Sequence, residues 1–70
     1  MKKGDKVHWN YANGKAAGVI EEIFFEPVEK TIKGSKIKRN ASKEEPAYLV
    51  KQEDGDKVLK SKSELSKGDI

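Results

Sequence analysis

The dipeptide Asn13-Gly14 constrains the fold more than any other feature of the sequence, because it is the strongest short signal for a tight β-hairpin turn. With these two residues as the turn, Trp9 lies opposite Gly18 and Val7 lies opposite Ile20. The apolar face of the pair then contains Val7, Trp9, Tyr11, Ala16, Gly18 and Ile20. The other face carries polar residues together with Val19. Residues 4–25 are therefore predicted to form a half-buried antiparallel pair with strands at 6–9 and 15–25.

The second strand of this hairpin is predicted to carry a β-bulge. Strict alternation would place Ile20 and Ile23 on opposite faces, with Glu21 and Glu22 between them. One extra residue at this point returns Ile23 to the core face and bends the strand. Such a bend allows a short sheet to curl into a small barrel. Pro27 is expected to end the element.

The segment 28–40 has the weakest pattern in the chain. Gly34-Ser35 separates its two isoleucines, Ile32 and Ile37, and marks either a turn or an irregular strand. We expect a mobile loop followed by a third strand around Ile37, although the pattern also allows a paired strand. Ser42 and Glu45 have the spacing of a capping box, and Pro46 limits any helix there to a single turn.

The last third of the chain contains two further strand signals. Residues 47–53 alternate with Tyr48 and Val50 on one face and Leu49 on the other, and Asp54-Gly55 is a tight-turn signal before a short strand at 57–60. We expect Leu65 to close one end of the barrel and residues 67–70 to be frayed. Five short strands in 70 residues predict one small all-β barrel spanning residues 1–70.

Composition limits the function classes. The chain has 15 lysines and arginines against 12 acidic residues, a net charge of +3, which is a weak excess for a general nucleic-acid binder. Cysteine is absent, and a lone His8 offers no metal constellation, so no metal or cofactor is predicted. No apolar run follows the first lysines, and none approaches the length of a membrane span. We therefore expect a cytoplasmic monomer without membrane contact.

These residues resemble the hypervirulence-associated Tudor domain family of small bacterial and fungal proteins. The matching residues are Gly4, Asp5, Lys6, Val7, Trp9, Gly14, Gly18, Ile20, Gly34, the runs 41–43 and 46–50, Ser63 and Leu65. The resemblance implies a five-stranded SH3-like, Tudor-type barrel with no known catalytic activity, and it supplies no established ligand. Arg39-Asn40 lengthens one segment relative to the family, and Lys60 stands where many relatives carry a histidine.

One candidate site is a basic run without an internal acidic residue. It consists of Lys30, Lys33, Lys36, Lys38, Arg39 and Lys43. Such a segment could bind the phosphates of RNA or DNA, as loops of small β-barrels do. Alternatively, the lysines keep a mobile loop solvated and protect an edge strand from pairing. Glu29, Glu44 and Glu45 flank the run and partly cancel its charge.

The aromatic residues form a second candidate set, namely Trp9, Tyr11, Phe24, Phe25 and Tyr48. Such rings could line a cage for a methylated lysine or arginine through cation–π attraction. Core packing is the alternative, and the register above favours it, since Trp9 and Tyr11 share the core face. Phe24 and Phe25 are adjacent, so one ring is expected to point outward and to be available for contact.

The sequence contains no nucleophile or acid–base constellation, so an enzyme is not expected. The leading hypothesis is a non-catalytic interaction module that binds a protein segment at the rim between residues 10–14 and 30–39. Nucleic-acid binding, with a base stacked on Tyr11 or Phe24, is the alternative. The predicted binding residues are Tyr11, Phe24, Phe25, Lys33, Lys36, Lys38 and Arg39.

Overall fold

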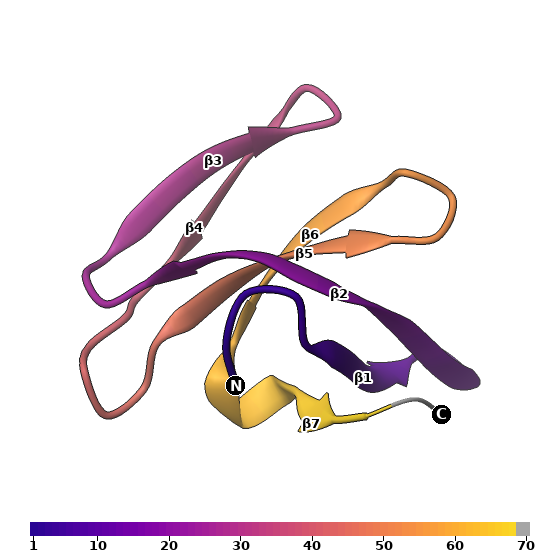
Figure 1. The fold of residues 1–70 in the computed structure, drawn as a ribbon. Helices are drawn as coiled ribbons and strands as arrows, with labels where there is room; N and C mark the ends of the chain where they lie inside the picture. The colour runs from indigo at the N-terminus through magenta and orange to yellow at the C-terminus, as the bar shows by residue number, and fades with distance from the viewer. Residues whose placement is uncertain (69–70) are drawn as a thin grey trace.

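The computed structural model describes residues 1–68 and confirms the all-β prediction (Figure 1). Its elements are β1 Lys6–Tyr11, β2 Gly14–Phe24, β3 Val28–Ile32, β4 Ser35–Arg39, β5 Ala47–Gln52, β6 Lys57–Ser61, the 3₁₀ turn η1 Lys62–Glu64 and β7 Ser66–Lys67. There are therefore seven strands in this range rather than the five predicted. None of the helices described in residues 1–68 is long and apolar enough to cross a membrane.

The strands form two antiparallel sheets, of which the larger has the order β6-β5-β2-β1-β7 and the smaller is the β3–β4 hairpin. In Figure 1 this hairpin lies beside the curled larger sheet, and its apolar residues pack against a cluster of that sheet. β5 is covered on both faces, as residues 47–50 are all buried. Tyr48 and Val50 belong to one apolar cluster with Val7, Trp9, Ile20 and Leu65, whereas Ala47 and Leu49 join Leu59 in a second. The predicted alternation along β5 is confirmed.

The β1–β2 hairpin forms, but its register differs from the predicted one by two residues. Tyr11 pairs with Gly14 and Val7 with Gly18, so the turn is Ala12-Asn13, with Ala12 at φ 49°. Because side chains alternate with period two, a shift of two residues leaves every side chain on its predicted face. The burial pattern is therefore the same in both registers, and the Asn-Gly turn signal alone could not decide between them.

The predicted bulge in β2 is confirmed. Pairing with β5 runs from Ile20 opposite Val50 to Glu22 opposite Leu49, which leaves Glu21 as the extra residue. Ile23 consequently packs against the same cluster as Ile20. A bulge of this kind bends the strand and increases its twist, which is why β2 can contribute residues to both apolar clusters.

The expectation of a mobile loop before Ile37 is wrong, because β3 and β4 pair along their whole lengths. Lys33 and Gly34 form the two-residue turn with φ of 52° and 78°, the positive values that a type I′ turn requires. Val28, Ile32 and Ile37 are half-buried and pack against the second cluster. The hairpin is thus held by its alternating apolar residues, although a lysine occupies a turn position that usually takes Asn, Asp or Gly.

The segment around Ser42 confirms only half of the capping box. The Ser42 hydroxyl accepts a hydrogen bond from the Glu45 N–H at 3.1 Å, but no helical turn forms. The Glu45 carboxylate instead accepts the N–H of Ser63 at 2.8 Å. This contact ties the segment to η1, and Leu65 directly after it is buried in the first cluster, as predicted.

The prediction of a frayed tail is wrong for residues 67 and 68, and residues 69–70 lie outside the described range. Lys67 pairs with Val7 in the β1–β7 ladder. The Gly68 N–H donates to the Lys6 carbonyl at 2.7 Å, and the His8 ring donates from Nδ1 to the Gly68 carbonyl at 3.0 Å. Backbone pairing therefore holds this segment, which an apolar pattern could not reveal.

Candidate functional site

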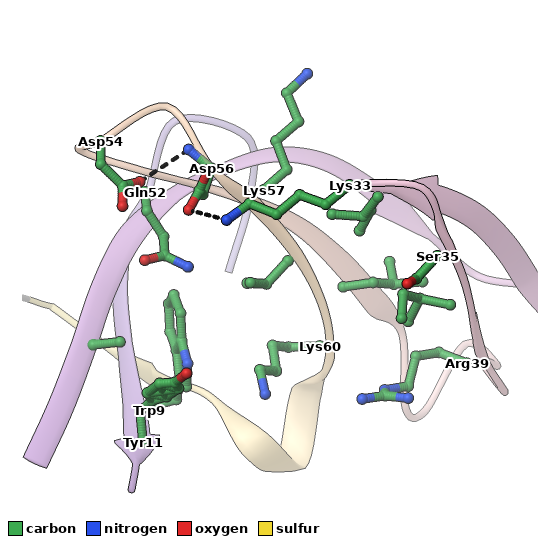
Figure 2. Close-up of a pocket in the computed structure, with 15 residues that line it drawn as sticks. Trp9, Tyr11, Lys33, Ser35, Arg39, Gln52, Asp54, Asp56, Lys57 and Lys60 are labelled. Atoms are coloured by element: carbon green, nitrogen blue, oxygen red, sulfur yellow. Dashed lines mark hydrogen bonds and ion pairs between the residues drawn. The ribbon is translucent and has the colours of Figure 1, made fainter. Parts of the chain in front are cut away.

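A groove of about 630 Å³ follows β6 between the β1–β2 hairpin and the β3–β4 hairpin (Figure 2). Its apolar surface comes from three hairpins, β1–β2, β3–β4 and β5–β6. The residues are Trp9, Tyr11, Ala16, Ile32, Ile37, Val58 and Leu59. Its polar surface comes from Lys33, Ser35, Arg39, Gln52, Asp54, Asp56, Lys57 and Lys60. The volume lies within the range of ligand-binding clefts. It occupies the rim that the sequence analysis singled out.

Two aromatic residues of β1 form one wall of the groove. Trp9 is 5% exposed and belongs to the first apolar cluster, whereas Tyr11 is 63% exposed. Tyr11 lies on the predicted face, at the last pair of the hairpin. None of the other three aromatic rings lines the groove. One accessible ring does not make an aromatic cage, but it does provide a contact surface.

The predicted outward ring beside the bulge is Phe25, which is 54% exposed. Phe24 is half-buried against the second cluster, and the Lys30 Nζ lies 5.0 Å from its ring centroid. The exposed aromatic therefore follows the end of β2 rather than lying at Phe24. Both rings are outside the residues that line the groove.

Each of the four cations in the groove lies within 4 Å of a carboxylate. The pairs are Lys33–Asp56 at 2.6 Å, Lys57–Glu21 at 3.2 Å, Arg39–Glu64 at 3.5 Å and Lys60–Glu64 at 3.8 Å. The hydrogen bond and the charge of Asp56 raise the pKa of Lys33 above its ordinary value. All these groups remain partly exposed, so the pairs shape the charge pattern more than they stabilise the fold.

The two ends of the groove differ in charge. At the β5–β6 turn, Asp54 and Asp56 lie near Lys33 and Lys57, and Lys57 pairs with Glu21, so three carboxylates stand against two cations and leave one negative charge in excess. At the opposite end, Arg39 and Lys60 share the single carboxylate of Glu64, which leaves one positive charge in excess. The groove is therefore dipolar along its length.

The predicted basic run is divided between two faces of the β3–β4 hairpin. Lys33 and Arg39 line the groove, but Lys36 and Lys38 are exposed and pair in register with Thr31 and Glu29 on the outer face. Lys30 is turned toward Phe24 and Glu22. Of the seven residues predicted to bind, the groove brings together Tyr11, Lys33 and Arg39.

The β5–β6 hairpin forms part of the site, although no sequence pattern predicted this. Asp54 and Gly55 were interpreted only as a turn, and Lys60 only as a departure from a family position. In the structure, β6 supplies the floor of the groove and Asp54 and Asp56 supply its acidic end. Only the pairing of distant strands places these residues opposite Arg39, so no local signal could have found them.

Comparison with known proteins identifies the family. The model of the family described as "Hypervirulence associated proteins TUDOR domain" matches residues 4–65, which includes all the residues of the groove. Neither a curated protein nor a solved structure gives a significant match. The antiparallel all-β architecture agrees with the SH3-like barrel of Tudor domains. The chain therefore belongs to the Tudor domain family of hypervirulence-associated proteins.

Proposed function

We propose that this Tudor domain is a non-catalytic module that binds a segment of a partner protein in the groove along β6. The observation that carries the proposal is the groove itself, in which apolar side chains of three separate hairpins meet an exposed aromatic ring and charges of both signs. Apolar side chains surrounded by polar and charged groups are the usual pattern of a protein-binding site. Tyr11 is the aromatic contact residue in this proposal, because Phe24 and Phe25 lie outside the groove.

Binding of RNA or DNA has less support from the same residues. Phosphate binding depends on several cations acting together on one surface. Here Lys33 and Arg39 already have carboxylate partners, and Lys36 and Lys38 face the other side of the hairpin. The acidic end of the groove would also repel a phosphate backbone. These features favour a protein partner of mixed charge.

A selection from a displayed library of random dodecapeptides tests this function. We expect enriched peptides to shift the amide resonances of residues 9–11, 32–39 and 57–60 in a ¹H–¹⁵N spectrum. Tyr11→Ala should weaken the same peptides by about tenfold, in line with the loss of a central aromatic contact. Phe25→Ala removes another exposed ring, which lies outside the groove, and should leave the affinity unchanged.

The same titration with single-stranded RNA and duplex DNA, at low and at physiological salt, tests the competing function. Shifts that persist at the higher salt and map to residues 30–39 would overturn the proposal. Peptides that shift only the surroundings of Phe25 would also contradict it.

A further inference from the structure

The basic end of the groove lies where three elements meet. Arg39 is the last residue of β4, Lys60 lies near the end of β6, and Glu64 ends the 3₁₀ turn η1. The Arg39 Nε lies 3.5 Å from one oxygen of the Glu64 carboxylate, and the Lys60 Nζ lies 3.8 Å from the other. Figure 2 shows the Arg39 guanidinium turned toward the side of the groove on which Lys60 lies. Two cations from different hairpins therefore converge on one point.

Glu64 uses little of the hydrogen-bonding capacity of these two cations. Its Oε1 accepts the Ser61 N–H at 2.9 Å, a contact that fixes the carboxylate at the end of β6. The distances of 3.5 and 3.8 Å to the cations are longer than the about 2.7–2.9 Å of a charge-assisted hydrogen bond. Arg39 donates from Nη1 to the Lys38 carbonyl, and in the part of the chain that the structure describes the Lys60 ammonium donates no hydrogen bond. Most N–H donors of both groups are therefore available to a ligand.

The same two cations are the most sheltered ones in the groove. The side chain of Lys60 is 24% exposed and that of Arg39 is 35% exposed, less than either lysine at the opposite end. Attraction between charges is screened less where solvent has less access. An anion is therefore held more strongly at this end than on the exposed lysines of the outer face.

The charge balance indicates which anion fits. Arg39 and Lys60 share the single carboxylate of Glu64, so one positive charge is in excess. One further carboxylate neutralises this excess and offers two oxygens to the guanidinium fork. A phosphate monoester, with a charge of about −1.5 to −2, would instead leave negative charge beside Glu64. The charge balance thus favours a carboxylate.

Each of the two cations has an aliphatic neighbour on its own strand. Ile37 precedes Arg39 by two residues on β4, and Val58 precedes Lys60 by two residues on β6, so each pair shares one face of its strand. All four residues line the groove, and both aliphatic side chains are half-buried. A ligand that matches this surface carries an apolar side chain next to its carboxylate.

We infer that Arg39 and Lys60 form a carboxylate-binding site, and that the partner segment is anchored there by an acidic side chain or a C-terminal carboxylate beside an apolar residue. This inference rests on the proposed function and adds the chemical group that the partner presents at the basic end of the groove. The two sources of the carboxylate share one chemistry, and the probes below separate them.

Two pairs of small probes test the site in ¹H–¹⁵N NMR titrations. N-acetyl-leucine and N-acetyl-leucinamide differ only in the terminal carboxylate. N-acetyl-glutamyl-leucinamide and N-acetyl-glutaminyl-leucinamide differ only in a side-chain carboxylate. We expect a charged probe to shift the Arg39 Nε–H and the Lys60 amide with a millimolar dissociation constant, as suits so small a ligand. Its neutral counterpart should bind about tenfold more weakly or worse, and the tighter charged probe identifies the source.

Three variants isolate the contribution of the cations. Lys60→Gln should weaken the charged probe by about tenfold, the loss expected for one charge-assisted hydrogen bond. Lys36→Gln removes the same charge from the outer face of the β3–β4 hairpin and should leave the affinity unchanged. Glu64→Gln keeps an oxygen for the Ser61 N–H but removes the competing charge, so it should strengthen binding several-fold. Cations that only held Glu64 in place would not produce this gain. Unchanged resonances away from the groove show that each variant is folded.

Several outcomes would overturn the inference. These are the absence of binding by both charged probes, equal affinities for charged and neutral probes, equal losses in Lys60→Gln and Lys36→Gln, and tighter binding of inorganic phosphate than of N-acetyl-leucine at the same ionic strength. Failure of the proposed function is distinguishable, because the probes need no partner protein. If the peptide library yields Tyr11-dependent ligands that Lys60→Gln does not weaken, only the carboxylate site fails. If the charged probes bind but no Tyr11-dependent peptide is found, the proposed function fails.

Discussion

The Nζ of Lys33 lies 2.6 Å from Oδ2 of Asp56 and joins the tip of the β3–β4 hairpin to the residue before β6. This ion pair crosses the acidic end of the groove, as Figure 2 shows. The two residues are far apart in sequence and lie in the turns of two hairpins that belong to different sheets. The pair therefore bridges the two walls of the groove at this end.

The first prediction concerns the protonation of Lys33. Asp56 raises the pKa of Lys33 above 10.5, so the interaction is fully present below pH 10.5 and is lost as pH rises through the raised pKa. Asp56→Asn should lower this pKa, whereas Asp54→Asn should lower it less, because Asp54 is a weaker contributor. Side-chain ¹⁵N NMR titration of Lys33 measures both. An unchanged pKa in Asp56→Asn would contradict the contact.

The second prediction concerns Gly18, where the backbone of β2 approaches β5 closely. A Cβ at this position would lie 2.6 Å from the Lys51 carbonyl oxygen and 2.6 Å from Val50 Cγ1. Gly18→Ala should therefore lower the free energy of unfolding by about 1–3 kcal/mol. Gly14→Ala is the matched control, because nothing lies within 4 Å of a Cβ there. Urea denaturation should give a clearly lower free energy of unfolding for Gly18→Ala than for Gly14→Ala.

The third prediction concerns the bulge. Deletion of Glu21 should remove the extra residue but keep Ile20 and Ile23 on the same face, so β2 loses the bend that the bulge gives it, at a cost of about 1–3 kcal/mol. Glu21→Ala keeps the bulge and loses only the contact with Lys57, which is partly exposed and worth at most about 1 kcal/mol. Thermal denaturation should give a lower Tm for the deletion variant than for Glu21→Ala. Equal stability of the deletion and substitution variants would show that β2 does not depend on the bulge.

The fourth prediction concerns alkaline unfolding. Burial raises the pKa of Tyr48 above 10.0. Below pH 10 the phenol is protonated in both states, but above it the unfolded chain loses the proton first, so the free energy of unfolding falls as pH rises through the folded pKa. Tyr48→Phe should remove this part of the decline. The stability difference between wild type and variant should be constant below pH 9, and a difference that stays constant up to pH 11 would contradict the prediction.

Much of the larger sheet could be predicted from local patterns. The alternation of Tyr48, Leu49 and Val50 gave the two faces of β5, and the spacing of Ile20 and Ile23 required the bulge that the structure contains. These features follow from burial, which leaves a period in the sequence. The register between paired strands leaves no such period. The observed β1–β2 pairing therefore differs from the predicted one by two residues, although every side chain keeps its predicted face.

The β3–β4 hairpin, the paired strand β7 and the candidate site were not predicted, because none of them depends on a local residue pattern. The β3–β4 turn uses Lys33 at positive φ, and β7 is held by backbone bonds at Ser66 and Lys67, so neither carries the residue types that mark such elements. The candidate site depends on the approach of Arg39 to Glu64 and of Lys33 to Asp56, which only the tertiary fold creates.

The carboxylate of Glu64 also decides how much of β6 remains open. It accepts the Ser61 N–H and holds Arg39 and Lys60 around it, so the strand edge is terminated at that residue. Because Leu59 is also buried under the β3–β4 hairpin, the part of this edge that another strand could reach is short and ends in fixed charges. Long exposed edges recruit strand after strand into aggregates, and short charged ones do not. The short, charged end of β6 therefore protects the domain from becoming a template for open-ended polymerisation.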